Sequence, residues 1–175
     1  MKKILFGTIA VAAGLLGQSV GAQEVTLKFH HIWNPQAMAA VNVIAPWCEK
    51  VAKESSNRLK CQILPAMSGG GTPAQLVDRI KDGVDDVTIT LPGYTAGRFP
   101  STEVFELPFM TNSAEAGARA TWDYMNKYSL KEFPGTKLLA TWVHDEGYVH
   151  TTSKPIHTLA DFKGLKVRAP TRQTN

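Results

Sequence analysis

Residues 58–92 read RLKCQILPAMSGGGTPAQLVDRIKDGVDDVTITLP, and this stretch decides the fold. It begins with a strand pattern at 58–65 and ends with another at 84–92. Between them Thr72 is a good helix N-cap, Pro73 fits the first helical position and Gly83 favours a stop. A strand, a helix and a second strand in this order indicate parallel strands joined by a crossover helix.

The same alternation extends upstream. Residues 24–33, EVTLKFHHIW, are rich in β-branched and aromatic side chains and predict another strand. Asn34-Pro35 breaks that strand and opens a long helix, expected from about Pro35 to Ser56. The first hundred residues therefore predict an α/β fold, with a parallel sheet covered by helices.

The two cysteines fall on two of these elements. Cys48 belongs to a predicted buried stripe of the long helix, and Cys61 alternates with Leu59 and Ile63 on one face of a strand. An oxidising compartment would allow a disulfide. The pattern favours instead two small core residues that touch across a helix–strand contact. The stripe consists of Val41, Ile44, Cys48 and Val51.

The second half of the chain is less regular. Residues 93–110 are rich in Gly, Pro and Phe and predict a packed loop, and Asn112 with Glu115 indicates a helix that runs to about Tyr128. Strands are expected at 136–143, 148–153 and 165–170, with a brief turn capped by Thr158. Because no long helices separate these strands, they predict a crossing into a second sheet.

The N-terminus has the pattern of a cleavable export signal. Lys2 and Lys3 precede an apolar run at 4–16, and small residues at Val20 and Ala22 fit cleavage after Ala22. The run is short for a membrane-spanning helix, so residues 1–22 predict secretion to the periplasm rather than anchoring.

Composition and motifs exclude several function classes. The 19 Lys and Arg exceed the 15 Asp and Glu by only four, and no cluster of basic and aromatic residues indicates nucleic-acid binding. The five histidines show no HExxH spacing and there is no CxxC, so no metal and no cofactor are expected. The His144-Asp145-Glu146 cluster and Ser68 lack a supporting nucleophile motif, so an enzyme is not expected. The histidines are His30, His31, His144, His150 and His157.

Two features are candidates for ligand contact. The loop Gly69-Gly70-Gly71 precedes a helix N-terminus, where free N–H groups favour an anion, but it lacks the phosphate-binding motifs and fits a plain turn better. Arg168 follows a short apolar stretch at 165–167. A guanidinium donates two parallel hydrogen bonds to a carboxylate, which a lysine cannot do. The local pattern alone leaves a solvated surface arginine equally open.

Four stretches together carry a family resemblance. They are LKFHHIWNP (27–35), SNRLKCQILPAMSGGGTPAQLVDRIKDGVDDVTI (56–89), FPSTEVFELPFM (99–110) and KPIHTLADFKGLKVRAP (154–170). The mature chain resembles the solute-binding proteins of tripartite ATP-independent periplasmic (TRAP) transporters, the DctP-like family. The resemblance implies a two-domain, periplasmic-binding-protein-like α/β fold that captures a small organic acid, closes by a hinge and delivers the acid to membrane permease subunits.

The resemblance also implies the substrate-binding residues. The arginine of the GLKxR segment, here Arg168, pairs with the substrate carboxylate in that family. The loop after the first strand lines the cleft, as do segments after the third strand and around 144–150. Together these nominate Arg168, Trp33, Asn34, His31, Tyr94, Tyr148, His144 and His150.

Two departures from the family refine the expectation. Some members carry a second arginine just before the KPI segment, where this chain has Gly147 to His150, so a monocarboxylate, aromatic or keto, is favoured over a dicarboxylate. Family members are also longer. The expected division is a signal peptide at 1–22, a first domain at about 23–140 and the start of a second, truncated domain at 141–175, which alone would lack covering helices and tight binding.

Three alternatives stay open at this point. The chain could be the receptor of an ABC importer or a sensor domain, both of which use similar binding domains. It could also be an exported hydrolase that uses Ser68 or the His144 cluster.

Overall fold

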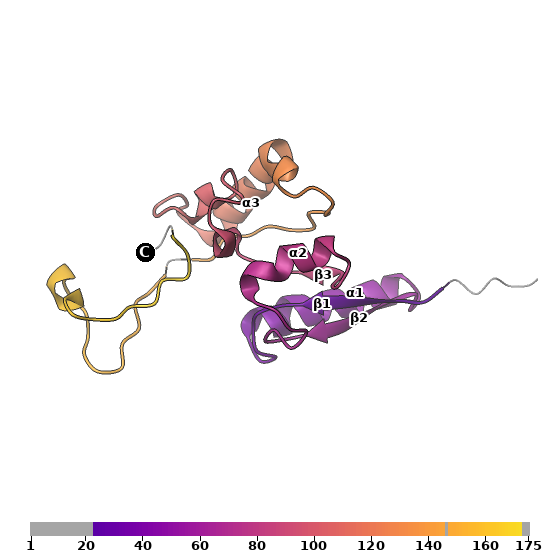
Figure 1. Ribbon diagram of the computed structural model, residues 1–175, viewed down its shortest axis with the longest axis horizontal. Helices are drawn as coiled ribbons and strands as arrows, with labels where there is room; N and C mark the ends of the chain where they lie inside the picture. The colour runs from indigo at the N-terminus through magenta and orange to yellow at the C-terminus, as the bar shows by residue number, and fades with distance from the viewer. Residues whose placement is uncertain (1–22, 146, 173–175) are drawn as a thin grey trace, which may run out of the picture.

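The computed structural model describes residues 23–145 and 147–172, and a small parallel sheet organises the first part of the chain (Figure 1). Strands β1 (Val25–His30), β2 (Leu59–Leu64) and β3 (Val87–Thr88) lie in the order β2-β1-β3. β1 pairs with β2 along its whole length. The predicted parallel α/β arrangement is therefore confirmed, whereas the predicted signal peptide lies outside the described residues.

β3 is much shorter than the predicted stretch 84–92. Only Val87 and Thr88 pair with β1. Just before them the carboxylate of Asp86 accepts a hydrogen bond from Lys28 N at 2.8 Å, where a longer strand would present a backbone carbonyl. The Asp86 side chain thus satisfies the backbone N–H of Lys28, and regular pairing between β1 and β3 begins only at Val87.

The first predicted helix forms, but with a π-helical opening. It comprises η1 (Ala40–Ile44) followed by α1 (Ala45–Glu54). Ile44 and Cys48 are buried and Val51 is half-buried, but Val41 is 51% exposed, so the predicted stripe is wrong at Val41. A π turn contains more residues than an α turn, and the buried face therefore passes through Ala40 instead.

A disulfide joins this helix to the sheet. Cys48 of α1 and Cys61 of β2 are bonded, with 5.6 Å between their Cα atoms. The preference for an unbonded contact was therefore wrong. The helix–strand packing that the pattern indicated brings the two backbones into the range that a disulfide spans. The bond borders the core of Phe29 and Ile44, against which Trp47 packs.

The second predicted helix is confirmed with its boundaries. It comprises η2 (Pro73–Gln75) and α2 (Leu76–Lys81). The Gln75 side chain reaches back to accept a hydrogen bond from Thr72 N at 2.9 Å, which satisfies one free donor at the helix start. Gly83 ends the helix in the left-handed region, at φ +68°.

The predicted packed loop contains two short 3₁₀ turns, η3 (Pro92–Thr95) and η4 (Glu103–Glu106). Phe99 between them is fully buried and stacks on Phe133, with ring centroids 4.6 Å apart. The loop therefore builds a second small core beside the sheet.

The third helix is α3 (Ala114–Tyr124), continued by η5 (Met125–Ser129) and η6 (Leu130–Glu132). Its N-cap is Ser113, whose Oγ accepts a hydrogen bond from Ala116 N, and not the predicted Asn112. Both residue types cap helices well, so the local sequence does not choose between neighbours. The helix itself is confirmed.

Residues 136–145, here called the strap, pass close to α3. A Cβ on Gly117 of α3 would lie 2.3 Å from Cγ2 of Val143, so the strap and the helix approach each other there with no room for a side chain. At the strap's end the Asp145 carboxylate accepts a hydrogen bond from Ala114 N at 3.1 Å. The strap is thus fastened to the first turn of α3.

Residues 147–172, here called the arm, run on in extended and turn conformations apart from the sheet (yellow in Figure 1). The predicted strands at 136–143, 148–153 and 165–170 are wrong: these residues form no strand in the structure. A strand needs a neighbour for its backbone groups, and no described strand lies beside these segments. The capped turn is confirmed as η7 (Leu159–Phe162), with Thr158 N donating to Asp161 Oδ2 at 2.8 Å.

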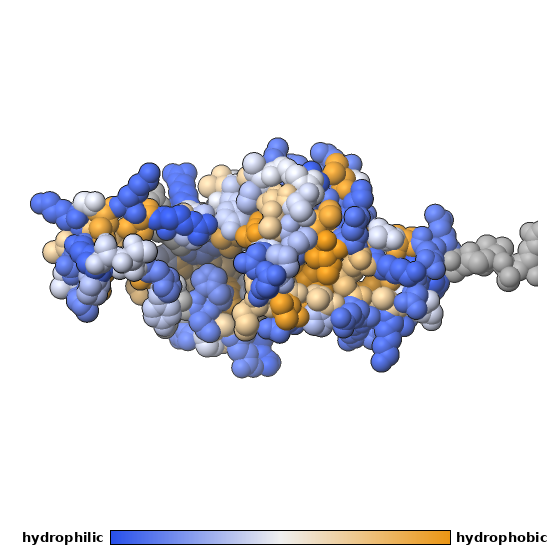
Figure 2. Space-filling view, turned by 90° about the horizontal axis from the view of Figure 1, so that it is seen from below, coloured by the Kyte–Doolittle hydropathy of each residue, from blue (hydrophilic) through white to orange (hydrophobic). Residues whose placement is uncertain are grey.

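Apolar side chains reach the surface in the arm as well as over the central body (Figure 2). In the arm they include Tyr148, 73% exposed, and Leu159, 89% exposed. Phe109, in the loop before α3, is fully exposed. The expectation that the apolar faces of 136–143 and 165–170 lack a cover agrees with the exposure of Leu139, Trp142 and Val167, which is 57%, 46% and 52%.

Candidate functional site

The carboxyl end of β1 carries the first group of predicted site residues. His31 is fully buried, its ring meets that of Phe29 edge-on at 6.3 Å, and it lies 5.9 Å from the ring of Trp33. Neither ring nitrogen of His31 has a hydrogen-bond partner among the described residues. Burial lowers the pKa of His31, so the imidazole is neutral near neutral pH. Asn34 is exposed, and its Oδ1 accepts a hydrogen bond from Gln36 N.

The neighbouring His30 is held by a buried ionic network that sequence reasoning missed. His30 Nδ1 lies 2.8 Å from Asp85 Oδ2. Arg79 grips the same carboxylate with two hydrogen bonds, Nε to Oδ2 at 2.5 Å and Nη2 to Oδ1 at 3.1 Å. The three residues come from β1, α2 and the turn before β3. No sequence motif predicts this network, because it depends on how the crossover helix α2 lies on the sheet.

The glycine loop closes over this network. Arg79 Nη2 donates to the carbonyl oxygen of Gly69 at 2.9 Å, and a Cβ at Gly69 would lie 3.0 Å from His30 Cε1. The loop therefore packs directly on the end of β1, where a larger side chain would force the histidine to move. This contact supports the interpretation of the loop as a tight turn.

Tyr94 is half-buried and lies on η3, the next element along the chain after β3. The preceding Gly93 is buried, and its N–H donates to Glu106 Oε1 at 2.7 Å. Tyr94 thus follows the sheet edge from which His31 and Trp33 also emerge, although no ring contact joins it to them among the contacts described.

The remaining predicted site residues, His144, Tyr148, His150 and Arg168, are all exposed. His144 Nδ1 is hydrogen-bonded to the backbone carbonyl oxygen of the adjacent Asp145, at 2.5 Å. The described ring contacts therefore bring His31 and Trp33 together, whereas these four residues lie on the strap and the arm. Figure 1 shows the arm at a distance from the sheet.

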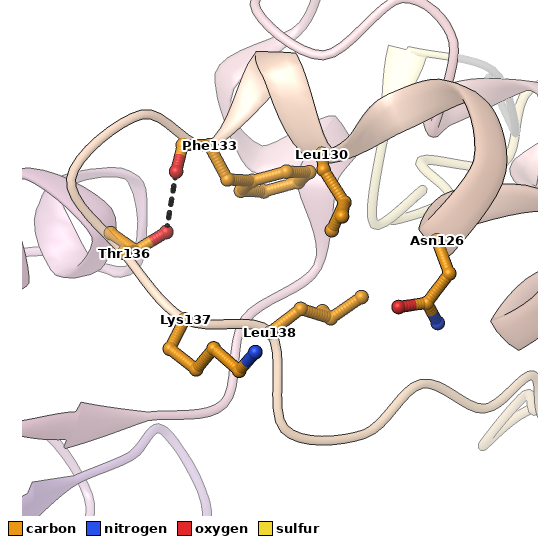
Figure 3. Close-up of a pocket in the computed structure, with 6 residues that line it drawn as sticks. All are labelled: Asn126, Leu130, Phe133, Thr136, Lys137 and Leu138. Carbon is orange, nitrogen blue, oxygen red and sulfur yellow. Dashed lines mark hydrogen bonds between the residues drawn. The ribbon is translucent and has the colours of Figure 1, made fainter.

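A separate cavity of about 230 Å³ lies where the chain turns back after α3 (Figure 3). Its wall includes the apolar Leu130, Phe133 and Leu138, and Thr136 Oγ1 closes the turn by donating to Phe133 O at 2.8 Å. None of the predicted site residues lines it. The full lining is Asn126, Leu130, Phe133, Thr136, Lys137 and Leu138.

No group of three or more His, Cys, Asp or Glu residues that could hold a metal ion occurs in 23–145 and 147–172. The Asp145 carboxylate caps α3, and Glu146 lies outside the described residues. Across the same ranges, none of the helices combines the length and the apolar character needed to cross a bilayer.

A parallel α/β sheet with polar and aromatic residues at the carboxyl ends of its strands is typical of small-molecule binding proteins. More specifically, the chain belongs to the bacterial extracellular solute-binding proteins of family 7 (DctP), whose family model matches residues 29–175. The expected family is confirmed.

Solved structures agree with this assignment. A TRAP solute-binding protein from Rhodoferax ferrireducens T118, in complex with copurified benzoate, has a TM-score of 0.81 and 55% identity, over 85% of this chain and 46% of that one. A marine metagenome TRAP protein specific for aromatic acid ligands, with 3-hydroxybenzoate, has a TM-score of 0.80 and 45% identity, over 86% and 47%. A Bordetella bronchiseptica TRAP protein with bound (R)- and (S)-mandelate has a TM-score of 0.69 and 33% identity, over 81% and 45%.

Curated relatives are more distant. The outer membrane transporter protein TsaT of Comamonas testosteroni is 27% identical over 150 residues, which cover 85% of this chain and 44% of the relative. The 2,3-diketo-L-gulonate-binding periplasmic protein YiaO of Escherichia coli K12 is 29% identical over 119 residues, or 66% and 36%. The chain thus spans less than half the length of these relatives.

Proposed function

We propose that this chain forms the first part of the cleft of a periplasmic TRAP solute-binding protein, and that the ligand is an aromatic monocarboxylate. The observation that carries the proposal is the ligand set of three structural relatives at 33% to 55% identity: benzoate, 3-hydroxybenzoate and mandelate. Each of these ligands combines one ring with one carboxylate.

The side chains of this chain suit such a ligand. Arg168 supplies the planar fork that recognises a carboxylate. Trp33, Tyr94 and Tyr148 supply aromatic faces against which a ring packs. The neutral His31 adds polarity at the edge of β1 without a second positive charge, which fits an acid with a single carboxylate.

The wider role follows the family. The protein would be exported to the periplasm, close over its ligand by a hinge between domains divided near residue 140, and pass the acid to TRAP membrane permease subunits. It would bind and release its ligand unchanged, without catalysis. Membership of family 7 favours this role over a receptor for an ATP-driven importer, a sensor domain or an exported hydrolase.

Calorimetric titration of the whole protein, of which this chain is proposed to form the first part, tests the proposal with benzoate, 3-hydroxybenzoate and mandelate, beside succinate. We expect the aromatic acids to bind and succinate not to bind. Arg168→Ala should weaken benzoate binding by about 30-fold or more, because it leaves a carboxylate unpaired in the cleft. Arg168→Lys should restore little, because it keeps the charge and loses the fork.

Arg172→Ala is the matched control, since Arg172 is also exposed and lies four positions further along. It should leave the affinity within about twofold of the unaltered protein. Full affinity for benzoate in Arg168→Ala would refute the carboxylate assignment. Binding of succinate in preference to the aromatic acids would refute the ligand class.

A further inference from the structure

We propose that a three-residue contact between Gly93, Glu106 and Thr171, here called the junction, holds the arm against the body and thereby positions Arg168. This inference rests on the proposed function, which assigns Arg168 to the ligand carboxylate. Its three members come from the turn after β3, from η4 and from the end of the arm.

Gly93 is the centre of the junction. Its N–H donates to Glu106 Oε1 at 2.7 Å. A Cβ added at Gly93 would lie 2.1 Å from Glu106 Oε2 and 2.8 Å from both Cβ and Cγ2 of Thr171. The Glu106 carboxylate and the Thr171 side chain therefore both press on the glycine, and any side chain at position 93 would displace at least one of them.

Thr171 is the anchor of the arm. At 6% exposure it is the one buried residue among those described in 147–172. Between Thr151 and Leu165 the hydrogen bonds join residues only three or four positions apart, as in the turn around Asp161. These local bonds shape the arm without attaching it, so the burial of Thr171 is what fixes the arm's end to the body.

Glu106 gives the contact its polarity. Burial raises the pKa of the Glu106 carboxyl, while the hydrogen bond from Gly93 N–H and the polar Thr171 side chain beside it oppose that rise. A carboxyl removed from water in this way needs such polar partners, because a buried acceptor without partners is destabilising. The junction therefore depends on the orientation of polar groups as well as on tight packing.

Arg168 stands three residues before the anchor. Ala169 and Pro170 separate it from Thr171, and the proline ring fixes one of the two backbone dihedrals of its residue. A short, stiffened connection transmits the position of Thr171 to the arginine. Arg168 itself is exposed, so its position depends on the backbone that carries it, and the junction fixes that backbone three residues further along.

Gly93→Ala tests the inference, with Ala120→Ser as the control, because Ser likewise adds one heavy atom and Ala120 is exposed on α3, outside the segments proposed to line the cleft. Two quantities are measured on each variant of the whole protein: amide hydrogen exchange over residues 163–172 by mass spectrometry, and the benzoate dissociation constant by calorimetry. We expect Gly93→Ala to speed exchange in 163–172 and to weaken benzoate binding more than tenfold. Ala120→Ser should change neither quantity more than twofold.

Thr171→Val gives an independent test in case an added Cβ at Gly93 also disturbs η3. It keeps the shape of the side chain and removes the hydroxyl, so exchange in 163–172 should rise and affinity fall at least threefold. Thr171→Ser keeps the hydroxyl and should recover most of the affinity lost in Thr171→Val.

The two readouts separate this inference from the function on which it rests. Unchanged exchange over 163–172 in both Gly93→Ala and Thr171→Val overturns the junction, even if the protein binds benzoate. Faster exchange with unchanged affinity overturns the positioning of Arg168. If the unaltered protein binds none of the aromatic acids, the proposed function fails, and exchange alone still decides whether the junction holds the arm.

Discussion

His30 Nδ1 lies 2.8 Å from Asp85 Oδ2, and the two side chains are 0% and 1% exposed. Arg79 donates to both oxygens of the same carboxylate, so that it shares Oδ2 with His30 and also contacts Oδ1. A buried carboxylate with two such partners joins β1, α2 and the turn before β3 at a single point. Removal of one partner from a buried ionic contact is costly, because it leaves the others unpaired.

We therefore expect Asp85→Asn to lower the free energy of unfolding by about 3 kcal/mol at pH 7. Burial raises the pKa of Asp85, but the hydrogen bonds from Arg79 and His30 outweigh it, so the folded pKa lies below the ordinary value. The stabilisation is full above the unfolded pKa of about 3.9 and is lost as the pH falls from there through the folded pKa.

Urea unfolding between pH 7 and pH 3 checks both parts of this prediction. The unaltered protein should lose more stability below about pH 4 than Asp85→Asn does. Asp82→Asn, a change at an exposed aspartate of the same turn, serves as the control and should stay within about 0.5 kcal/mol. A parallel pH dependence in Asp85→Asn and the unaltered protein would contradict the assignment.

The disulfide between Cys48 and Cys61 should contribute substantially to stability. The two cysteines are 13 residues apart, and closing a loop of that length stabilises the folded state by about 3 kcal/mol in the chain-entropy model. Reduction should lower the denaturation midpoint by the corresponding amount. The double variant Cys48→Ala, Cys61→Ala should unfold early with or without reductant, whereas equal midpoints for the oxidised and reduced protein would refute the contribution.

Gly117→Ala should reverse the usual effect of this substitution. In an ordinary helix interior alanine is more stable than glycine by about 1 kcal/mol. Here the new Cβ would lie 2.3 Å from Val143 Cγ2 and 2.8 Å from Thr111 Cγ2, so we expect a loss of about 1 to 3 kcal/mol.

Thermal unfolding of Gly117→Ala alone and combined with Val143→Ala measures this coupling. The second change removes one of the two obstructing groups, so part of the loss should be recovered. Ala120→Gly, at an exposed position of α3, should show the ordinary cost of about 1 kcal/mol. Strictly additive effects of the changes at positions 117 and 143 would mean that the strap does not press on the helix.

Local patterns predicted the first half of the fold well. The Thr72 cap, Pro73 and Gly83 mark the second helix in both sequence and structure. The strands β1 and β2 lie within the predicted stretches, because their side chains alternate against a helix that the sequence also specifies. These features are encoded within a few residues of one another, which is why they could be predicted.

Features that depend on distant partners could not be predicted. Strand propensity at 136–143 and 165–170 does not supply a neighbouring strand, and none of the described strands lies there. The Cys48–Cys61 bond depends on how one helix lies over one strand, and the contact of His30 with Asp85 joins residues 55 positions apart. For the same reason the sequence nominated eight site residues, of which the described contacts join His31 and Trp33 by their rings.

The two edges of β1 are covered to different extents, because β2 pairs with the whole strand and β3 only with its last two residues. In β1, Val25 N donates to Arg58 O on the β2 side, whereas Lys28 N donates to the Asp86 carboxylate on the β3 side. Amide groups of a strand alternate between its two sides. Thr26 therefore faces the β3 side, where β3 has not yet begun. Amide hydrogen exchange along β1 should therefore alternate, fast at Thr26 and slow at Leu27. Within this one strand, the amides that face β2 are protected from solvent, and the amide that faces the uncovered side is not.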